Sequence, residues 1–187
     1  MTERRNKMNL EHKTVSREEI YKGAVVSLVK DTITLPNGKT AQREVILHNG
    51  ASAVIPMDEE GNIFLVRQYR HPAGKELLEI PAGLLEDGED PLECAKRELE
   101  EETGYKASEF SHIFSMYTAI GFCTEKIHIY LAKGLYEGKQ NLDEDEFVNV
   151  EKYSLDEALD MIFDGRIEDG KTVCGILAAK KLTDSKK

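Results

Sequence analysis

The chain has 187 residues, of which 40% are hydrophobic, enough for one domain of ordinary size with a buried core. Its net charge of −10 argues against general binding to nucleic acids or to anionic membranes, which need a basic protein surface. No stretch approaches the length of apolar sequence that a membrane span requires.

Residues 1–48 are predicted to form a β-rich arm. The elements expected there are, in chain order, a loose polar start over residues 1–18, a hairpin over 21–39 that turns near Lys30 and Asp31, a second turn at 36–38, and a strand over 42–48. These strands together predict a small N-terminal antiparallel sheet.

Residues 49–187 are predicted to form the main domain, an α+β layered sandwich in which strands alternate with two or three helices. Its expected elements are, in chain order, a long hairpin of 51–57 and 63–69 across a turn at 58–62, a short strand over 77–81, a helix after residue 90, strands over 112–118 and 126–132, an acidic loop over 141–146, a strand over 147–153, a helix that Ser154 caps, and a last helix over 171–182.

The helix after residue 90 has complete start and stop signals. Asp90 is a good N-cap, Pro91 suits the first helical position, and Gly104 ends the helix. At about 100° per residue, one arc of this helix gathers three carboxylates, those of Glu98, Glu101 and Glu102. Like charges at this spacing repel each other, so either the arc faces solvent or a hard divalent cation such as Mg²⁺ neutralises it.

The three cysteines indicate a reducing compartment. Cys94, Cys123 and Cys174 are far apart and form no Cys-x-x-Cys pair, which suggests ordinary thiols and neither a zinc site nor a disulfide framework. The N-terminus has no apolar signal core. We therefore expect a cytoplasmic protein.

The acidic helix lies within a longer motif. Gly83 is followed after five residues by Glu89, and after seven more by the run from Arg97 to Tyr105, RELEEETGY. This pattern resembles the Nudix box, G-x5-E-x7-R-E-U-x-E-E-x-G-U, where U is a bulky aliphatic residue. Every charged and glycine position matches, and Tyr105 is the one loose fit. Over about residues 20–180 the chain is similar to the ADP-ribose pyrophosphatase branch of Nudix hydrolases.

That resemblance implies the Nudix fold, a mixed β-sheet sandwiched between helices. A homodimer is implied as well, with residues 1–48 as the dimerisation region. It also implies Mg²⁺-dependent hydrolysis, with Mn²⁺ as a substitute, of the diphosphate bond in nucleoside diphosphate sugars such as ADP-ribose, giving AMP and ribose 5-phosphate. Ile120 stands where members that prefer ADP-ribose usually carry proline. ADP-glucose, GDP-mannose, dinucleoside polyphosphates and dinucleotide cofactors therefore stay open as substrates, and a non-catalytic ADP-ribose sensor is the alternative from another class.

The resemblance also implies roles for single residues. It assigns metal ligation to the Ala82 carbonyl, Glu98, Glu102 and Glu146; catalysis to Glu144 as general base, Glu101 at or beside the metal and Arg97 as a donor fork that aims the ligands; substrate binding to Arg43, Arg70, Glu79 and Tyr21; and a structural part in the motif to Gly83, Glu89 and Gly104. Two alternatives stay open, Asp145 as the base and Arg67 in place of Arg70.

Overall fold

The protein was analysed as a computed structural model that describes residues 9–185, and these fall into two compact units. The first unit contains the described part of residues 1–48 together with residues 119–125. The second contains 49–118 and the described part of 126–187. Within residues 9–185, no helix is long and apolar enough to cross a membrane.

The first unit is a three-stranded antiparallel sheet in the order β1-β2-β3, as the sequence predicted. Its strands are β1 (Lys13–Lys22), β2 (Ser27–Thr34) and β3 (Thr40–Leu47). The expectation of a loose start is wrong from Lys13 onward, because β1 pairs along its length with β2; residues 1–8 lie outside the described residues. The segment 119–125 joins the unit through hydrogen bonds between Ile46 and the residues Phe122 and Thr124.

The predicted turn near Lys30 and Asp31 is wrong. Strand β2 passes through both residues without a break, and the chain turns earlier, where the Gly23 amide donates to the Val26 carbonyl at 2.9 Å. Asp31 is a buried acid within this strand, and the Arg17 guanidinium on β1 donates two hydrogen bonds of 2.7 Å to its carboxylate. A polar pair that signals a turn in the sequence is thus accommodated by a partner on the neighbouring strand.

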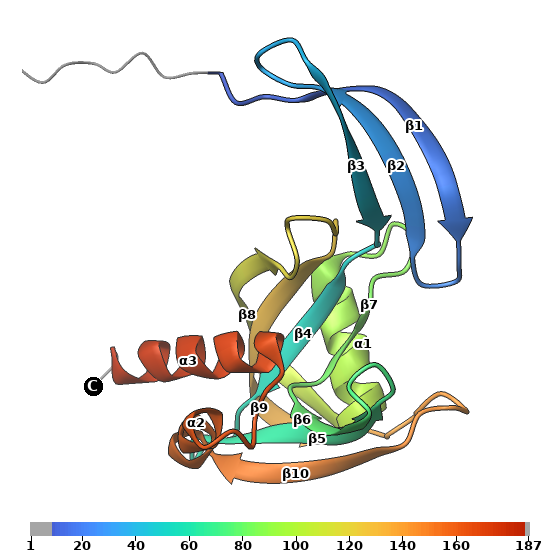
Figure 1. Ribbon diagram of the computed structural model, residues 1–187. Coiled ribbons are helices and arrows are strands. Elements are labelled where there is room, and N and C mark those ends of the chain that lie inside the picture. Colours follow the sequence, from blue (N-terminus) through green and yellow to red (C-terminus); the bar gives the residue numbers. More distant parts are fainter. Residues whose placement is uncertain (1–8, 186–187) are drawn as a thin grey trace, which may run out of the picture. The chain divides into compact units, whose positions relative to one another are not determined.

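The second unit has two sheets and three helices, in agreement with the predicted α+β fold (Figure 1). One sheet has the order β7-β4-β9-β8 and is mixed, since β4 and β9 run parallel and the other pairs antiparallel. The other sheet has the order β10-β5-β6 and is antiparallel. The bounds are β4 (Ala51–Pro56), β5 (Asn62–Arg70), β6 (Lys75–Glu79), β7 (Ala82–Leu84), α1 (Pro91–Thr103), β8 (Tyr105–Tyr117), β9 (Lys126–Glu137), β10 (Val148–Ser154), α2 (Leu155–Phe163) and α3 (Gly170–Asp184).

The long hairpin predicted from residues 51–57 and 63–69 is not formed. The turn between them exists, but only the bridge between Met57 and Ile63 joins the two segments, and the strands then enter different sheets. Strand β4 is buried along its whole length, and β7 and β9 occupy its two edges. Because neither edge of β4 is open, β5 pairs with β6 and β10 instead.

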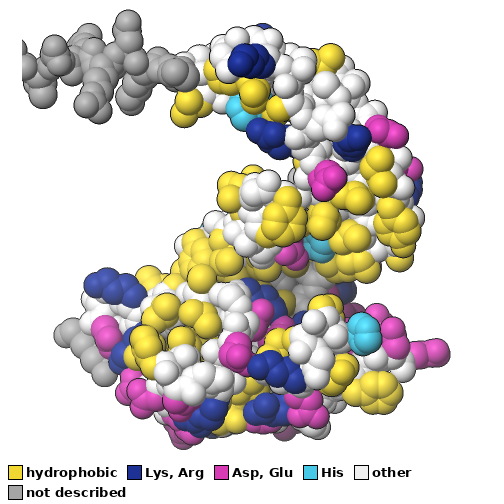
Figure 2. All heavy atoms as spheres, in the orientation of Figure 1, with side chains coloured by type: hydrophobic (Ala, Val, Ile, Leu, Met, Phe, Trp, Pro, Cys, Tyr) yellow, Lys and Arg dark blue, Asp and Glu magenta, His cyan; other side chains and the backbone are white. Residues whose placement is uncertain are grey.

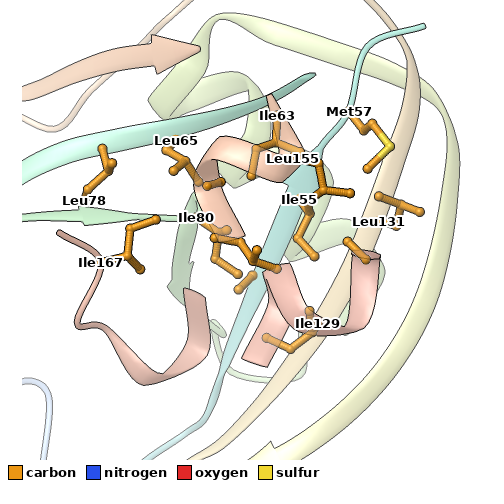
Figure 3. Close-up of a cluster of buried hydrophobic side chains, with 14 of the residues drawn as sticks. Ile55, Met57, Ile63, Leu65, Leu78, Ile80, Ile129, Leu131, Leu155 and Ile167 are labelled. Carbon is orange, nitrogen blue, oxygen red and sulfur yellow. The ribbon is translucent and has the colours of Figure 1, made fainter. Parts of the chain in front are cut away.

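The alternating side chains of β4 divide the core between the two faces of the mixed sheet. Ile55 belongs to a large cluster with residues of the second sheet, α2 and α3, including Ile63, Leu155 and Ile176 (Figure 3). Val54, its neighbour in the chain, packs instead with Leu99 of α1. The mixed sheet is therefore sandwiched between α1 on one face and α2 with α3 on the other, which fixes α1 against β4 and β7.

Candidate active site

Helix α1 begins and ends where the sequence predicted. The Asp90 side chain accepts a hydrogen bond of 2.9 Å from the Leu92 amide, and Pro91 opens the helix. Gly104 adopts a left-handed conformation with φ of 73°, and its amide donates to the Glu100 carbonyl at 2.8 Å. Both ends of the helix that carries the acidic cluster are thus capped.

The carboxylates of Glu98 and Glu102 lie on the buried side of α1, against β7. Glu98 is 9% exposed and Glu102 only 2%. The Ala82 amide donates to Oε2 of Glu102 at 3.0 Å. A Cβ atom at Gly83 would come within 1.9 Å of Oε1 of Glu98, so any other residue would force the Glu98 carboxylate to move. The resemblance gave Gly83 a structural part in the motif, and in the structure the absence of a side chain here leaves space for the Glu98 carboxylate.

The pKa values of both buried carboxyl groups are raised, so their charged forms are disfavoured. Burial raises the pKa of the Glu98 carboxyl to about 7, against the opposing effect of Arg97. Burial, reinforced by the charge of Glu98, raises the pKa of Glu102 to about 8. A neighbouring carboxylate, Glu146, raises both pKa values further. Two acids held in a dry position beside a third favour a bound cation, which would stabilise their charged forms.

The donor set fits a hard divalent cation. Glutamate oxygens and a backbone carbonyl are the ligands that Mg²⁺ prefers. As the side chains stand, no group of three or more His, Cys, Asp or Glu within residues 9–185 is gathered closely enough to hold a metal ion. One reason is that Arg97 binds Oε1 of Glu98. Glu98 would therefore exchange this arginine for the metal, and Glu102 and Glu146 would move toward it.

Arg97 is the centre of an ion-pair network on the exposed side of this cluster. Its Nε and Nη2 atoms donate to the two oxygens of Glu89 at 3.0 and 3.1 Å. Its Nη1 atom donates to Glu98 and, at 3.0 Å, to Glu101. Nη2 also donates to the Leu84 carbonyl at 3.1 Å. One planar guanidinium thus fixes three acids and the strand β7, the arrangement required of a group that aims ligands.

Glu79, at the end of β6, is a further buried acid, with 1% exposure. Arg70 donates to it through two hydrogen bonds, Nε to Oε1 at 2.7 Å and Nη2 to Oε2 at 2.8 Å. The Lys171 ammonium group also donates to Oε2. Although burial works in the opposite direction, the hydrogen bond from Arg70 and the charge of Lys171 hold the pKa of Glu79 below its usual value. The acid is therefore charged and paired with two cations.

The acidic loop is joined to the end of α1. The Gln140 side chain donates to the Glu102 carbonyl at 2.7 Å, and the Asn141 amide donates to the Glu101 carbonyl at 3.0 Å. Glu146 at the end of the loop lines a cavity of about 340 Å³ together with residues of β5 and β10. Glu144 is exposed, and within residues 9–185 no hydrogen bond or ion pair ties it to α1. Its role as base stays a prediction.

Two predicted substrate residues, Arg43 and Tyr21, belong to the first unit. Arg43 lies on β3, and its Nη1 atom donates to the Gln42 carbonyl at 2.8 Å. Tyr21 lies at the end of β1, is 59% exposed, and has its ring against Gly23. The roles of both residues in substrate binding stay predictions. In place of Arg70, the sequence also left Arg67 open; that arginine is bonded to Glu151 on β10.

The sequence analysis missed Lys171, a nearly buried cation whose side chain is 11% exposed. Its local signal was weak, because a lysine in the first turn of a helix normally faces solvent. Asp169, two residues earlier, is the N-cap of α3 and could have marked the start of this helix. The link from Lys171 to Glu79, 92 residues away in the chain, has no local signal at all.

Comparison with known families agrees with this geometry. A model of the NUDIX domain matches residues 47–174, and a model of the nucleoside diphosphate sugar hydrolase N-terminal domain matches residues 13–46. The chain therefore belongs to the Nudix hydrolase family, as the box from Gly83 to Tyr105 predicted.

Individual relatives extend over most of the chain. It is 50% identical over 168 residues to a methanol dehydrogenase activator of Bacillus methanolicus, a match that spans 89% of this chain and 91% of the relative. It is 45% identical over 170 residues to an ADP-ribose pyrophosphatase of Bacillus subtilis, which spans 90% and 92%. The fold matches a crystal structure of an ADP compounds hydrolase with a TM-score of 0.86 at 21% identity, over 96% of this chain and 98% of the other.

We predict that Gly83→Ala abolishes metal uptake while the protein remains folded. The added Cβ would displace the Glu98 carboxylate, a predicted metal ligand, from its place beside β7. Isothermal calorimetry with Mn²⁺ and thermal unfolding would measure the two effects. Gly170→Ala is the matched control, since a Cβ at Gly170 has no neighbour within 4 Å. Normal Mn²⁺ binding by Gly83→Ala would contradict the assignment.

Proposed function

We propose that the protein hydrolyses the diphosphate bond of nucleoside diphosphate sugars, with ADP-ribose as the first substrate to test, giving AMP and ribose 5-phosphate. The observation that carries this proposal is the pair of buried carboxylates, Glu98 and Glu102, next to the cations Arg70 and Lys171. The charge of Glu102 contributes to the pKa of Arg70, and the charge of Lys171 to that of Glu102, so these groups lie within each other's fields. Carboxylates suit a divalent cation, and the cations suit a diphosphate.

A bound Mg²⁺ would neutralise charge on the diphosphate and activate the attacking water. In this proposal Glu98, Glu102, Glu146 and the Ala82 carbonyl hold it. Arg97 would release Glu98 to the metal and keep Glu101 in position through its remaining bonds to Glu101 and Glu89. The remaining work of the protein is to place the reacting groups and to stabilise charge that develops on the leaving phosphate.

Substrate contact is proposed for the arginines and the aromatic side chain already named. Arg70 would bind the diphosphate, because a guanidinium can hold two phosphate oxygens at once. Arg43 would lie at the adenosine end and Tyr21 would stack on the adenine. The name of the Bacillus subtilis relative, ADP-ribose pyrophosphatase, supports ADP-ribose as the substrate to test first. The name of the Bacillus methanolicus relative describes an effect on another enzyme and gives no substrate. Because Ile120 stands in place of the proline, ADP-glucose, GDP-mannose, dinucleoside polyphosphates and dinucleotide cofactors are also to be tested as substrates.

We also propose that the protein is a homodimer that assembles through the N-terminal sheet. Large apolar side chains of the first unit are exposed, among them Val15 (63%), Ile20 (51%) and Phe122 (55%), and Figure 2 shows apolar groups on the surface of this unit. Exposed apolar surface of this kind favours an interface. Sedimentation velocity at micromolar concentration tests this, and a monomer mass would contradict it.

A reducing compartment, the cytoplasm, fits three free cysteines.

The proposal is tested with a panel of nucleoside diphosphate derivatives. Each is incubated with the protein and Mg²⁺, and the products are scored by phosphate release after phosphatase coupling. We predict Mg²⁺-dependent turnover, fastest with ADP-ribose, and a loss of about 100-fold or more in Glu102→Gln, because a catalytic metal supplies several kcal/mol. A wild-type protein that cleaves none of these compounds is not a hydrolase of this class.

Glu144→Gln is predicted to lower turnover by about 100-fold, the usual contribution of a general base, while Mn²⁺ affinity stays near that of the wild type. Asp145→Asn is the matched control, since it removes one acid from the same exposed loop. If Asp145→Asn carries the loss instead, Asp145 is the base. Near-normal turnover in both variants would remove this loop from the proton transfer.

A further inference from the structure

The first turn of α3 is bonded to the end of β6, outside the box motif. Thr172 is fully buried; its hydroxyl donates to Asp169 at 2.6 Å and accepts from the Ile80 amide at 2.9 Å. Lys171 donates to Asp169 at 3.1 Å and to the Glu79 carboxylate. Glu79 and Ile80 are thus held from α3 at two adjacent positions. The side chain of Ile80 is anchored at the same time in the apolar core (Figure 3).

This connection extends to Arg70 and to the metal-binding segment. Glu79 takes two of the three guanidinium nitrogens of Arg70, Nε and Nη2. Among residues 9–185 no hydrogen bond is recorded to its third nitrogen, Nη1, which leaves the outer edge of the guanidinium available to an anion. Three residues after Glu79, the Ala82 amide donates to Glu102 at 3.0 Å. Glu102 and these two cations also interact through their charges.

Charge balance gives Lys171 a specific part in this network. Lys171 and Arg70 together match the two acids that they bind, Glu79 and Asp169. Without Lys171 the remaining three residues would carry one net negative charge beside the place where an anionic substrate must bind. The Glu79 carboxylate would also lose one of the donors that fix its orientation, and Arg70, which is bonded to it at two points, would follow its rotation.

We propose that Lys171 is a positioning residue for diphosphate binding: acting through Glu79, it orients Arg70 so that the Nη1 edge of the guanidinium receives a phosphate oxygen. This inference rests on the proposed function. It predicts a defect in substrate binding that exceeds any change in metal binding, because within residues 9–185 Lys171 bonds to none of the residues assigned to the metal and acts on Glu102 only through its charge. A lysine that served only to dock α3 would affect stability without this selectivity.

The experiment compares Lys171→Met with Lys171→Arg, which restores the charge. We expect Lys171→Met to raise the KM for the best substrate about tenfold, the loss of one charge-assisted interaction, with kcat and the Mg²⁺ requirement little changed. Binding of α,β-methylene-ADP, measured by calorimetry without turnover, should weaken by the same factor. Lys171→Arg should recover most of both losses. Lys180→Met is the matched control, because Lys180 lies on the same helix and pairs with Asp156 and Asp184.

Each result decides the inference. A wild-type KM and a wild-type affinity for α,β-methylene-ADP in Lys171→Met overturn it and leave the proposed function intact. Equal losses in Lys171→Arg and Lys171→Met, or in Lys180→Met, overturn it as well. A wild-type protein without turnover overturns the proposed function and this inference together. If thermal unfolding shows that Lys171→Met does not fold, Lys171→Gln replaces it, since glutamine keeps a donor and removes the charge.

Discussion

The site depends on one constraint: α1 packs against β4 and β7 in an orientation that buries two of its own carboxylates. Taking Glu98 and Glu102 out of water is unfavourable unless partners compensate for it. The Ala82 amide and Arg97 supply part of that compensation. The raised pKa values of both acids indicate that the compensation is incomplete without a cation. The apolar contact of Leu99 with Val54 holds the helix in place regardless.

This constraint explains the neighbouring sequence. Gly83 has no side chain because the Glu98 carboxylate fills the space that a Cβ would need. Arg97 is placed one residue before Glu98, where its fork can reach acids on both sides, Glu89 before the helix and Glu101 one turn later. Gly83 lies on β7, and Arg97, Glu98 and Glu101 lie on α1, whereas Glu89 lies in the turn just before the helix. Most of these residues are therefore built on regular elements, which position side chains more precisely than loops do.

Local signals predicted those parts of the structure that depend on neighbours in the chain. The ends of α1 and the Ser154 cap of α2 follow from hydrogen bonds within a few residues, and the structure has them where the sequence indicated. The turn assigned near Lys30 failed because Arg17, on another strand, satisfies the acid of this pair. The predicted hairpin of β4 and β5 is wrong because β4 pairs with β7 and β9, which are distant in the chain. Which strands pair is thus decided by the whole sheet and not by the turn between β4 and β5. Lys171 escaped notice for the same reason: its partner is distant in the chain.

The site contains a negatively charged side and a positively charged side, within a protein whose net charge is −10. Carboxylates on α1 form the side suited to a metal, whereas Arg70 and Lys171 form the side suited to phosphate. At physiological ionic strength the Debye length is about 8 Å, so acids elsewhere on the surface are largely screened while these nearby cations are not. Local charge therefore decides whether an anion can bind. In the proposed function both sides would contact the diphosphate, which all candidate substrates share, so we expect selection among them to come from residues outside the box.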